Sequence, residues 1–303
     1  MTRIGIIGGT GYTGGELARL LCRHPDVEIA AMTSRQNAGR PVSEVHPYLR
    51  GYVDLEFTER ISDTEDLDLV FVATPHGVAM NEVPVLLERG IKAIDLSGDY
   101  RLRDPAVYEK WYGHHHTDVE NLEKAVYGLP ELFRGKIRGA DLVANPGCYA
   151  TSAILACAPL MGSGLVEEDV FIDSKSGTSG AGMVPSARTH HPNCATAVIP
   201  YGVGTHRHTP EIEIAVDMFA GSRMDLLFVP HLVPVVRGIL SDCYFRLKGD
   251  ASQEDVDAVY MKQYGAERFV HYVQEPLSRE VMGSNHAEVS SKVLGGRVVA
   301  FGA

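Results

Sequence analysis

Several features that mark common protein classes are scarce or missing in this sequence. The chain of 303 residues has one tryptophan and five cysteines, and no two cysteines have the C-x-x-C spacing. An odd number of cysteines without that spacing argues against a disulfide framework and against a zinc site. No apolar run is long enough to cross a bilayer, and the apolar N-terminus is too short for a signal peptide. We therefore expect a cytoplasmic protein with reduced thiols, no membrane association and no metal.

Basic residues are fewer than acidic residues in this chain. Lys and Arg number 28 against 39 Asp and Glu, so the formal net charge is −11. An acidic balance of this size opposes binding to nucleic acid or to an anionic membrane, although it still permits a local basic pocket. The length is sufficient for two domains with a large core. These values favour a globular protein that acts on a small molecule.

The start of the chain carries a glycine-rich turn. Residues 3–7 form a short apolar strand, glycines follow at positions 8, 11 and 14, and an amphipathic helix comes next. Such glycines permit a tight turn, close approach of the backbone to a pyrophosphate at a helix N-terminus, and close packing of helix on strand. The pattern predicts a dinucleotide site. Its expected contacts are Gly8, Thr10, Gly11, Tyr12, Thr13 and Gly14.

The end of the second predicted strand indicates which dinucleotide binds. Residues 27–32 form this strand, and Thr33, Ser34 and Arg35 follow it. An NAD site usually has an acidic residue here for the ribose hydroxyl, whereas an arginine accommodates the 2′-phosphate of NADP. Ser34 and Arg35 therefore favour NADP. The alternative is a solvated arginine at a strand end.

Two later strands end in polar turns. Apolar segments at residues 67–73 and 92–96 alternate with helix-like segments. This alternation predicts an α/β fold with a parallel, doubly wound sheet, whose ligands bind at the carboxyl ends of the strands. Thr74 and Pro75 at one such end are expected to contact the cofactor. Arg101 at another is expected to bind an anionic substrate group through its guanidinium.

A cysteine lies at the junction of a strand and a helix. The apolar run Leu142–Ala144 is followed by Asn145–Gly147, which breaks the strand, and a helix-like segment covers residues 151–161. Cys148 thus lies near a helix N-terminus, where the helix dipole stabilises a thiolate. The alternative is a buried and inert cysteine, which is common in protein cores.

The second half of the chain contains a glycine-rich loop and a different order of elements. Residues 170–175 are predicted to form a strand, and residues 176–182 a loop that is a lid, a cofactor-facing turn or a flexible connection. If it faces the cofactor, Ser176 and Gly177 supply the contacts. Further strands and a helix predict a mixed or antiparallel sheet. They are expected at residues 225–230, 239–247, 252–264 (the helix) and 297–301.

Two histidines approach the start of another predicted helix. Thr209 is expected as its N-cap and Pro210 as its first residue. In an extended approach to that helix, His206 and His208 would point the same way. Together with Glu211 they predict acid-base chemistry or substrate binding. By contrast, the histidine-rich stretch at residues 111–116 lacks the spacing of a zinc site and is expected to be a solvated loop.

These motifs in combination resemble the N-acetyl-gamma-glutamyl-phosphate reductases, NADPH-dependent enzymes of arginine biosynthesis. The resemblance covers nearly the whole chain. The motifs are GGTGYTGGEL (8–17), TSR (33–35), ATPHG (73–77), DLSGDYRL (95–102), AVYGLPEL (125–132), NPGCY (145–149), SGTSGAG (176–182), HRHTPEI (206–212) and PHLVP (230–234).

The resemblance implies an architecture and a mechanism. Residues 1–147 would form an NADP-binding Rossmann domain, and residues 148–303 an α+β semialdehyde-dehydrogenase-like domain for catalysis and for assembly into a homodimer or homotetramer. Cys148 would attack an acyl phosphate to give a thioester, which NADPH reduces to a semialdehyde, and His208 would be the acid-base group. The implied substrate-binding residues are Arg101, Asn145, His206 and Glu211.

The sequence departs from the family pattern at three places. Ala150 stands where the family usually has proline, and Met183 where it usually has a basic residue. The chain ends at Ala303, and we expect it to lack the C-terminal helix of the family.

Two other functions fit parts of the pattern. One is reduction of an aminoadipyl phosphate on an acidic carrier protein in lysine biosynthesis, which needs a basic docking surface that the net charge disfavours. The other is a non-catalytic NADP-binding redox sensor, which would not need Cys148 together with His208.

Overall fold

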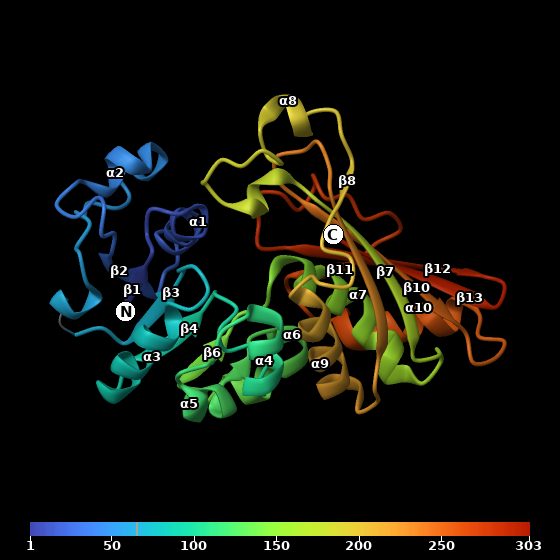
Figure 1. Cartoon of the computed structure of the whole chain (residues 1–303). Helices are drawn as coiled ribbons and strands as arrows, with labels where there is room; N and C mark the ends of the chain where they lie inside the picture. Colours follow the sequence, from blue (N-terminus) through green and yellow to red (C-terminus); the bar gives the residue numbers. More distant parts are fainter. Residues whose placement is uncertain (65) are drawn as a thin grey trace. The chain divides into compact units, whose positions relative to one another are not determined.

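The computed structural model describes residues 1–64 and 66–303, which form two compact units (Figure 1). The first unit consists of Met1–Gly128 and Gly135–Pro146, and the second of Leu129–Arg134 and Gly147–Ala303. The sequence pattern predicted one passage from the first domain to the second. The chain also enters the second unit at Leu129–Arg134 and then returns to the first.

A sheet of six strands forms the centre of the first unit, in the order β2-β1-β3-β4-β6-β5. All neighbouring strands in it run parallel, so the predicted α/β sheet is confirmed. Its strands are β1 (Thr2–Ile7), β2 (Val27–Met32), β3 (Leu69–Val72), β4 (Lys92–Asp95), β5 (Val126–Tyr127) and β6 (Leu142–Ala144).

Apolar side chains cover both faces of this sheet. Ile4 packs in one core cluster with Ala18 of the first helix, whereas Val70 packs in a second cluster with Val83 of a later helix. Buried residues on both faces explain the nearly continuous apolar sequences of these strands. The helices are α1 (Tyr12–Leu21), α2 (Val42–Val45), α3 (Ala79–Glu88), α4 (Pro105–Tyr112) and α5 (Val119–Lys124), with the short 3-10 turns η1 (Pro47–Leu49) and η2 (Ile61–Asp63).

The second unit is built on a mixed sheet of seven strands in the order β11-β12-β13-β10-β7-β9-β8. Strands β7 and β9 run parallel, while β10 runs antiparallel to both β7 and β13. The strands are β7 (Asp169–Ser176), β8 (Ile199–Pro200), β9 (Asp225–Leu232), β10 (Ile239–Arg246), β11 (Val270–Tyr272), β12 (Ala287–Leu294) and β13 (Arg297–Gly302).

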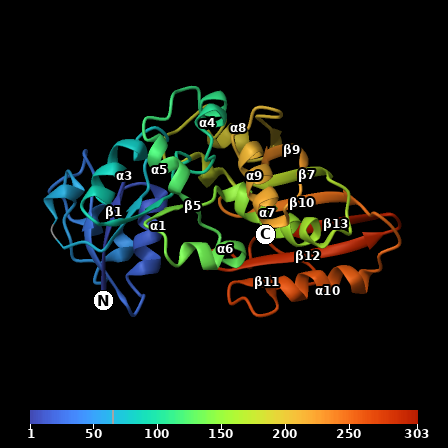
Figure 2. The same ribbon diagram turned by 90° about the horizontal axis from the view of Figure 1, so that it is seen from below.

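Helices pack against one face of this second sheet. Helix α7 (Cys148–Ser163) contacts the central strands, and α10 (Gln253–Tyr264) lies beside it against β11 and β12 (Figure 2). The hydroxyls of Tyr260 and Tyr264 donate to carbonyl oxygens of α7, at Ala156 and Leu155. Helix α7 is buried on nearly every side, which explains its continuous apolar sequence. The other helices of this unit are α8 (His191–Cys194) and α9 (His208–Ala220), with the 3-10 turn η3 (Thr178–Ala181). Helix α6 (Pro130–Ile137) begins in the second unit, and its last three residues belong to the first.

Two local expectations are wrong. Helix α9 begins at His208 rather than after Thr209, with Arg207 as its N-cap, and the ring of His206 accepts the backbone N–H of His208. The stretch at residues 111–116 is not a solvated loop throughout. His116 is buried against the ring of Tyr108, and Nε2 of His114 lies 3.0 Å from the Tyr108 hydroxyl.

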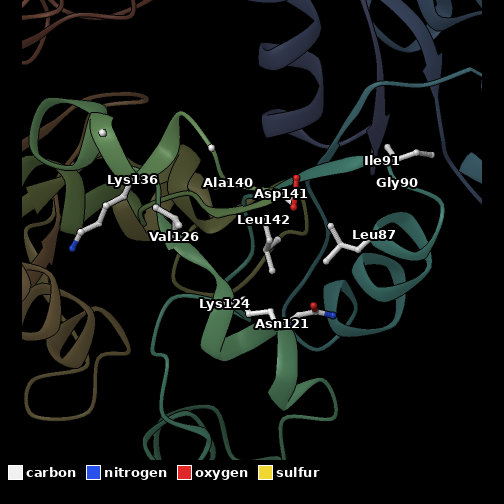
Figure 3. Close-up of a pocket in the computed structure, with 12 residues that line it drawn as sticks. Leu87, Gly90, Ile91, Asn121, Lys124, Val126, Lys136, Ala140, Asp141 and Leu142 are labelled. Atoms are coloured by element: carbon white, nitrogen blue, oxygen red, sulfur yellow. The ribbon is translucent and has the colours of Figure 1, made fainter.

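A cavity of about 690 Å³ opens in the first unit, where strands β4, β5 and β6 begin (Figure 3). Its charged groups include Lys124, which pairs with Glu120, and Asp141, which pairs with Lys92. The cavity therefore lies at the amino-terminal edge of the sheet, opposite the edge that carries the glycine-rich turn. No helix within the described residues is long and apolar enough to cross a membrane.

Candidate active site

The glycine-rich turn after β1 has the geometry of a nucleotide cradle. Gly8 has a φ of +81°, and a Cβ atom there would collide with the carbonyl oxygen of Ala73. A Cβ at Gly14 would collide with the backbone of Gly8 and Gly9. Gly11 is the N-cap of α1, so the first backbone N–H groups of that helix face outward without a capping side chain. This arrangement fits a pyrophosphate.

Side chains at the ends of β1 and β2 lie next to each other. The hydroxyl oxygens of Thr10 and Ser34 are 3.4 Å apart, and the amide of Asn37 donates to Ser34. The side chain of Arg35 is exposed. One contact was missed by the sequence analysis: Nε2 of the buried His46 lies 2.8 Å from the carbonyl oxygen of Gly9 and braces the turn. A lone histidine in an irregular segment gives no signal of this role.

A buried carboxylate supports the turn after β3. Asp99 accepts hydrogen bonds from the backbone N–H groups of Gly77 and Ala79, at 2.8 and 3.1 Å, and from the hydroxyl of Tyr108 at 2.8 Å. It thereby fixes the segment that contains Thr74 and Pro75, the two predicted cofactor contacts. Nothing in the spacing of the DLSGDYRL motif indicates this role of Asp99.

Arg101 has a different environment from the one expected. It is only 6% exposed, and its Nε and Nη2 donate to the carbonyl oxygens of Asn145 and Leu96. The guanidinium thus ties together the loops that follow β4 and β6. Nearby, burial raises the pKa of Asp95 to about 6, although two hydrogen bonds from Ser97 act in the opposite direction. The side chain of Asn145 donates to the carbonyl oxygen of Pro146.

Cys148 is the first residue of α7 and is exposed. Gly147 is the N-cap in extended conformation, and its carbonyl oxygen accepts the backbone N–H and the hydroxyl of Thr151. The alternative of a buried cysteine is therefore wrong for Cys148. It describes Cys157 and Cys243, which are both fully buried. An exposed sulfur at a helix N-terminus is where a thiolate is stabilised.

Glu211 connects the start of α7 to the start of α9. Its side chain is 1% exposed, and Oε1 accepts the backbone N–H of Gly147 at 2.7 Å. Its Oε2 lies 3.9 Å from Nε2 of His208. One carboxylate therefore contacts both the residue that precedes Cys148 and the imidazole of His208.

His206 and His208 have different environments, although the centroids of their rings are only 4.8 Å apart. Burial, with the charges of His208 and Arg207, lowers the pKa of His206 to about 3. His206 is therefore neutral near pH 7, and its Nδ1 accepts the backbone N–H of His208. This contact makes His206 a support for His208.

An aromatic group that the sequence analysis missed lies beside Cys148. The ring of Tyr149 packs edge-on against the rings of His206 and His208, at 5.7 and 6.0 Å between centroids. Its hydroxyl donates to the carbonyl oxygen of His231 and accepts from the hydroxyl of Tyr201. Tyr149 thus fixes the position of the histidine pair. The NPGCY motif contains this tyrosine, but nothing in its spacing reveals its partners.

The glycine-rich loop after β7 packs tightly within the second unit. The backbone N–H of Gly177 donates to the carbonyl oxygen of Gly238, and a Cβ at Gly177 would lie 2.7 Å from the carbonyl oxygen of Val236. Ser176 is buried. The start of this loop is therefore a packed turn rather than a flexible connection.

Family profiles match both halves of the chain. The profile described as "Semialdehyde dehydrogenase, NAD binding domain" matches residues 3–140, and "Semialdehyde dehydrogenase, dimerisation domain" matches residues 148–303. An N-acetyl-gamma-glutamyl-phosphate reductase of Methanosphaera stadtmanae is 48% identical over 94% of this chain and 84% of its own length. The chain belongs to the N-acetyl-gamma-glutamyl-phosphate reductase family. A reductase of Moorella thermoacetica in the same family is 46% identical over 100% of this chain and 90% of its own length.

Solved structures show the same fold at low sequence identity. Aspartate semialdehyde dehydrogenase II of Vibrio cholerae, in complex with ASA, matches with a TM-score of 0.75 and 14% identity, over 100% of this chain and 92% of its own. The Candida albicans aspartate semialdehyde dehydrogenase with NADP matches with a TM-score of 0.74 and 16% identity, over 99% of this chain and 93% of its own. The predicted family and fold class are confirmed. Membership identifies the chain as an oxidoreductase with a domain for a nicotinamide dinucleotide, and its second unit as a dimerisation domain.

Proposed function

We propose that this chain reduces N-acetyl-gamma-glutamyl phosphate to the semialdehyde, with NADPH as reductant and inorganic phosphate as the second product. The observation that supports it most directly is the arrangement of an exposed Cys148 and of His208 around the carboxylate of Glu211. A nucleophile, an acid-base group and a residue that orients them are what covalent acyl transfer requires.

In the first half of the proposed reaction, the Cys148 thiolate attacks the acyl carbon of the acyl phosphate. The carbon–oxygen bond to phosphate breaks, and inorganic phosphate leaves with the electron pair, so that a thioester remains on Sγ. The N-terminal backbone N–H groups of α7 stabilise the negative charge that develops on the carbonyl oxygen. The hydrogen bond from Gly147 to Glu211 fixes the turn on which this geometry depends.

In the second half, the thioester is reduced. The hydride for this reduction would come from the nicotinamide when the cofactor is bound. His208 gives a proton to the carbonyl oxygen of the thioester, which yields a thiohemiacetal on Cys148, and then takes it back as the carbon–sulfur bond breaks. The semialdehyde leaves and the Cys148 thiolate is regenerated. His206 remains neutral and positions His208 throughout, since its pKa is about 3.

The residues of the first unit fit NADP. The glycine turn would bind the pyrophosphate, and Thr10 and Ser34 lie together at the ends of β1 and β2. In this proposal Arg35, which is exposed, pairs with the 2′-phosphate. Thr74 and Pro75 contact the cofactor from the turn that Asp99 supports. Arg101 and Asn145 act on the substrate by fixing the loop before Cys148 rather than through a direct anion contact.

We also propose that the second unit assembles as a homodimer through the open face of its sheet, with a homotetramer as the next larger assembly. Leu227, Phe171 and Tyr244 are paired across β9, β7 and β10 and form a continuous row on that face. Their side chains are 45, 47 and 42% exposed. An apolar row of this kind favours contact with a second copy. The five cysteines are all free thiols, which supports a cytoplasmic location.

The reverse reaction tests the function. N-acetylglutamate semialdehyde, phosphate and NADP are expected to give NADPH with the wild-type protein. Cys148→Ser should lower the rate on the order of 10⁴-fold or more, because the covalent step is lost. Cys22→Ser is the matched control, since Cys22 lies in the first unit, where its thiol donates to the carbonyl oxygen of Arg19.

A second measurement tests the thioester. With acyl phosphate and no NADPH, the wild-type protein should release phosphate in a burst equal to the enzyme concentration, and the Cys148→Ser protein should not. Unchanged reduction by Cys148→Ser would refute the proposal. Turnover only of an acyl phosphate bound to a carrier protein would show that the acyl group is wrong.

A further inference from the structure

A structured turn in the second unit contains Arg188, an arginine to which the proposed mechanism assigns no role. Residues 186–189 form this turn, in which the hydroxyls of Ser186 and Thr189 lie 2.9 Å apart. The side chain of Asn193 donates to the carbonyl oxygen of Ala187 at 2.7 Å. These bonds fix the backbone on both sides of Arg188, so its side chain starts from a defined position.

Arg188 lies over the ring of Tyr201, with the guanidinium carbon 5.3 Å from the ring centroid. Within residues 1–64 and 66–303, no hydrogen bond or ion pair engages its guanidinium. A guanidinium over an aromatic face keeps its N–H groups available at its edge. Arg188 is therefore a positioned cation with donors for an anion.

Tyr201 connects Arg188 to the reaction centre. Its hydroxyl donates to the hydroxyl of Tyr149, the residue that follows Cys148, at 3.1 Å. Its ring lies 5.5 Å from the ring of His206. Burial raises the pKa of Tyr201, and the charge of the Cys148 thiolate adds to this effect while the charge of Arg188 opposes it. Both charges therefore act on the same phenol.

The proposed substrate has a negative group at each end. The phosphate is joined through its bridging oxygen to the carbon that Cys148 attacks, so it must lie beside the thiol. The carboxylate lies at the other end of the five-carbon chain. Arg188 lies over the Tyr201 ring, whereas Tyr149, which follows Cys148, contacts the hydroxyl of Tyr201, so the guanidinium is better placed for the remote end. We propose that Arg188 binds the carboxylate of the substrate, an assignment that rests on the proposed function and adds a specificity-determining residue to it.

The reverse reaction allows binding of the two anionic groups to be measured independently, because the carboxylate belongs to the semialdehyde and phosphate is a separate substrate. Arg188→Gln should lower kcat/KM for the semialdehyde about ten- to hundredfold and leave KM for phosphate unchanged. Arg188→Lys should recover part of the loss because it keeps the charge without the planar fork. Arg268→Gln is the control, since Arg268 lies 5.3 Å from the ring of Phe269 in the same way.

A substrate without the carboxylate gives an independent readout. The wild-type protein should disfavour 4-acetamidobutanal, which differs from the semialdehyde only in that group. The Arg188→Gln protein should have nearly equal kcat/KM for the two aldehydes. The substitution and the removal of the carboxylate eliminate the same interaction, so their effects are not additive. A purely structural role of Arg188 would lower both rates equally.

Binding of N-acetylglutamate, measured by calorimetry, tests Arg188 without turnover. Weaker binding to Arg188→Gln than to Arg268→Gln supports the assignment, and equal binding overturns it. A rise in KM for phosphate instead of the semialdehyde also overturns it. If wild-type protein gives no NADPH, the proposed function fails, and the calorimetry still decides the role of Arg188.

Discussion

Glu211 accepts the backbone N–H of Gly147 at 2.7 Å, and this hydrogen bond between residues 64 apart in sequence joins the starts of two helices. The acceptor lies in the first turn of α9, one turn from His208, and the donor immediately precedes Cys148. A carboxylate that is 1% exposed is stable only with such partners. The carboxylate of Glu211 therefore links the backbone next to the nucleophile to the acid-base group of the proposed reaction.

We expect Glu211→Gln to lower kcat about 10- to 100-fold, because the amide can still accept from Gly147 but no longer offers a negative charge to His208. Glu213→Gln on the same helix is the matched control, since Glu213 is only half-buried. Steady-state rates and thermal unfolding of both proteins check this prediction. Equal rates for the two variants would contradict it.

His206 should make the free energy of unfolding decrease as the pH falls below 6.5. Its pKa is about 3 when folded and 6.5 in the unfolded chain, so between these values the unfolded state binds more protons. The stability that it contributes is therefore present above pH 6.5 and is lost as the pH falls. Urea unfolding at pH 7 and pH 4.5 should show a smaller loss for His206→Gln than for wild type. A loss of the same size in both proteins would mean that His206 is not buried as the structure has it.

Asp95 should have the opposite effect. Its pKa is about 6 when folded and 3.8 unfolded, so between these values the folded state keeps a proton that the unfolded state has lost. Its contribution to stability therefore falls as the pH rises through this window, by about 3 kcal/mol. The free energy of unfolding of Asp95→Asn relative to wild type should rise between pH 4 and pH 7. Asp54→Asn, at an exposed carboxylate, should show no such change.

Arg35 should decide the choice of cofactor. Arg35→Gln is expected to raise KM for NADP about tenfold or more and to leave KM for NAD unchanged, because only NADP carries the 2′-phosphate. Arg40→Gln controls for the loss of an exposed arginine in the same unit, where Arg40 pairs with Glu44. Equal changes for both cofactors would show that Arg35 does not contact the 2′-phosphate.

Features that depend on local chemistry could be predicted from the sequence. The turn at Gly8 and Gly14 follows from backbone space, and the position of Cys148 follows from a strand that ends at a break before a helix. Features that depend on distant partners could not. Arg101 has the chemistry of an anion ligand, yet its Nε and Nη2 donate to the carbonyl oxygens of Asn145 and Leu96.

The same limit applies to the histidine region. Thr209 followed by Pro210 is a standard helix start, but α9 begins two residues earlier, at His208, whose backbone N–H donates to the ring of His206. The link between Arg188 and Tyr201 joins residues that no sequence period relates. Interactions of this kind become visible only when the fold brings the segments together.

The brief entry of Leu129–Arg134 into the second unit limits how these reductases can exchange parts. Within that unit, Gln263 donates to the carbonyl oxygen of Glu131, and Arg134 pairs with Glu267. A chimera made by one crossover at residue 147 would take this segment from one parent and its partners from the other. A chimera that replaces the nucleotide half therefore needs two further junctions, one on each side of residues 129–134. These junctions keep the six residues with the parent that supplies the catalytic unit, and we expect function to depend on them.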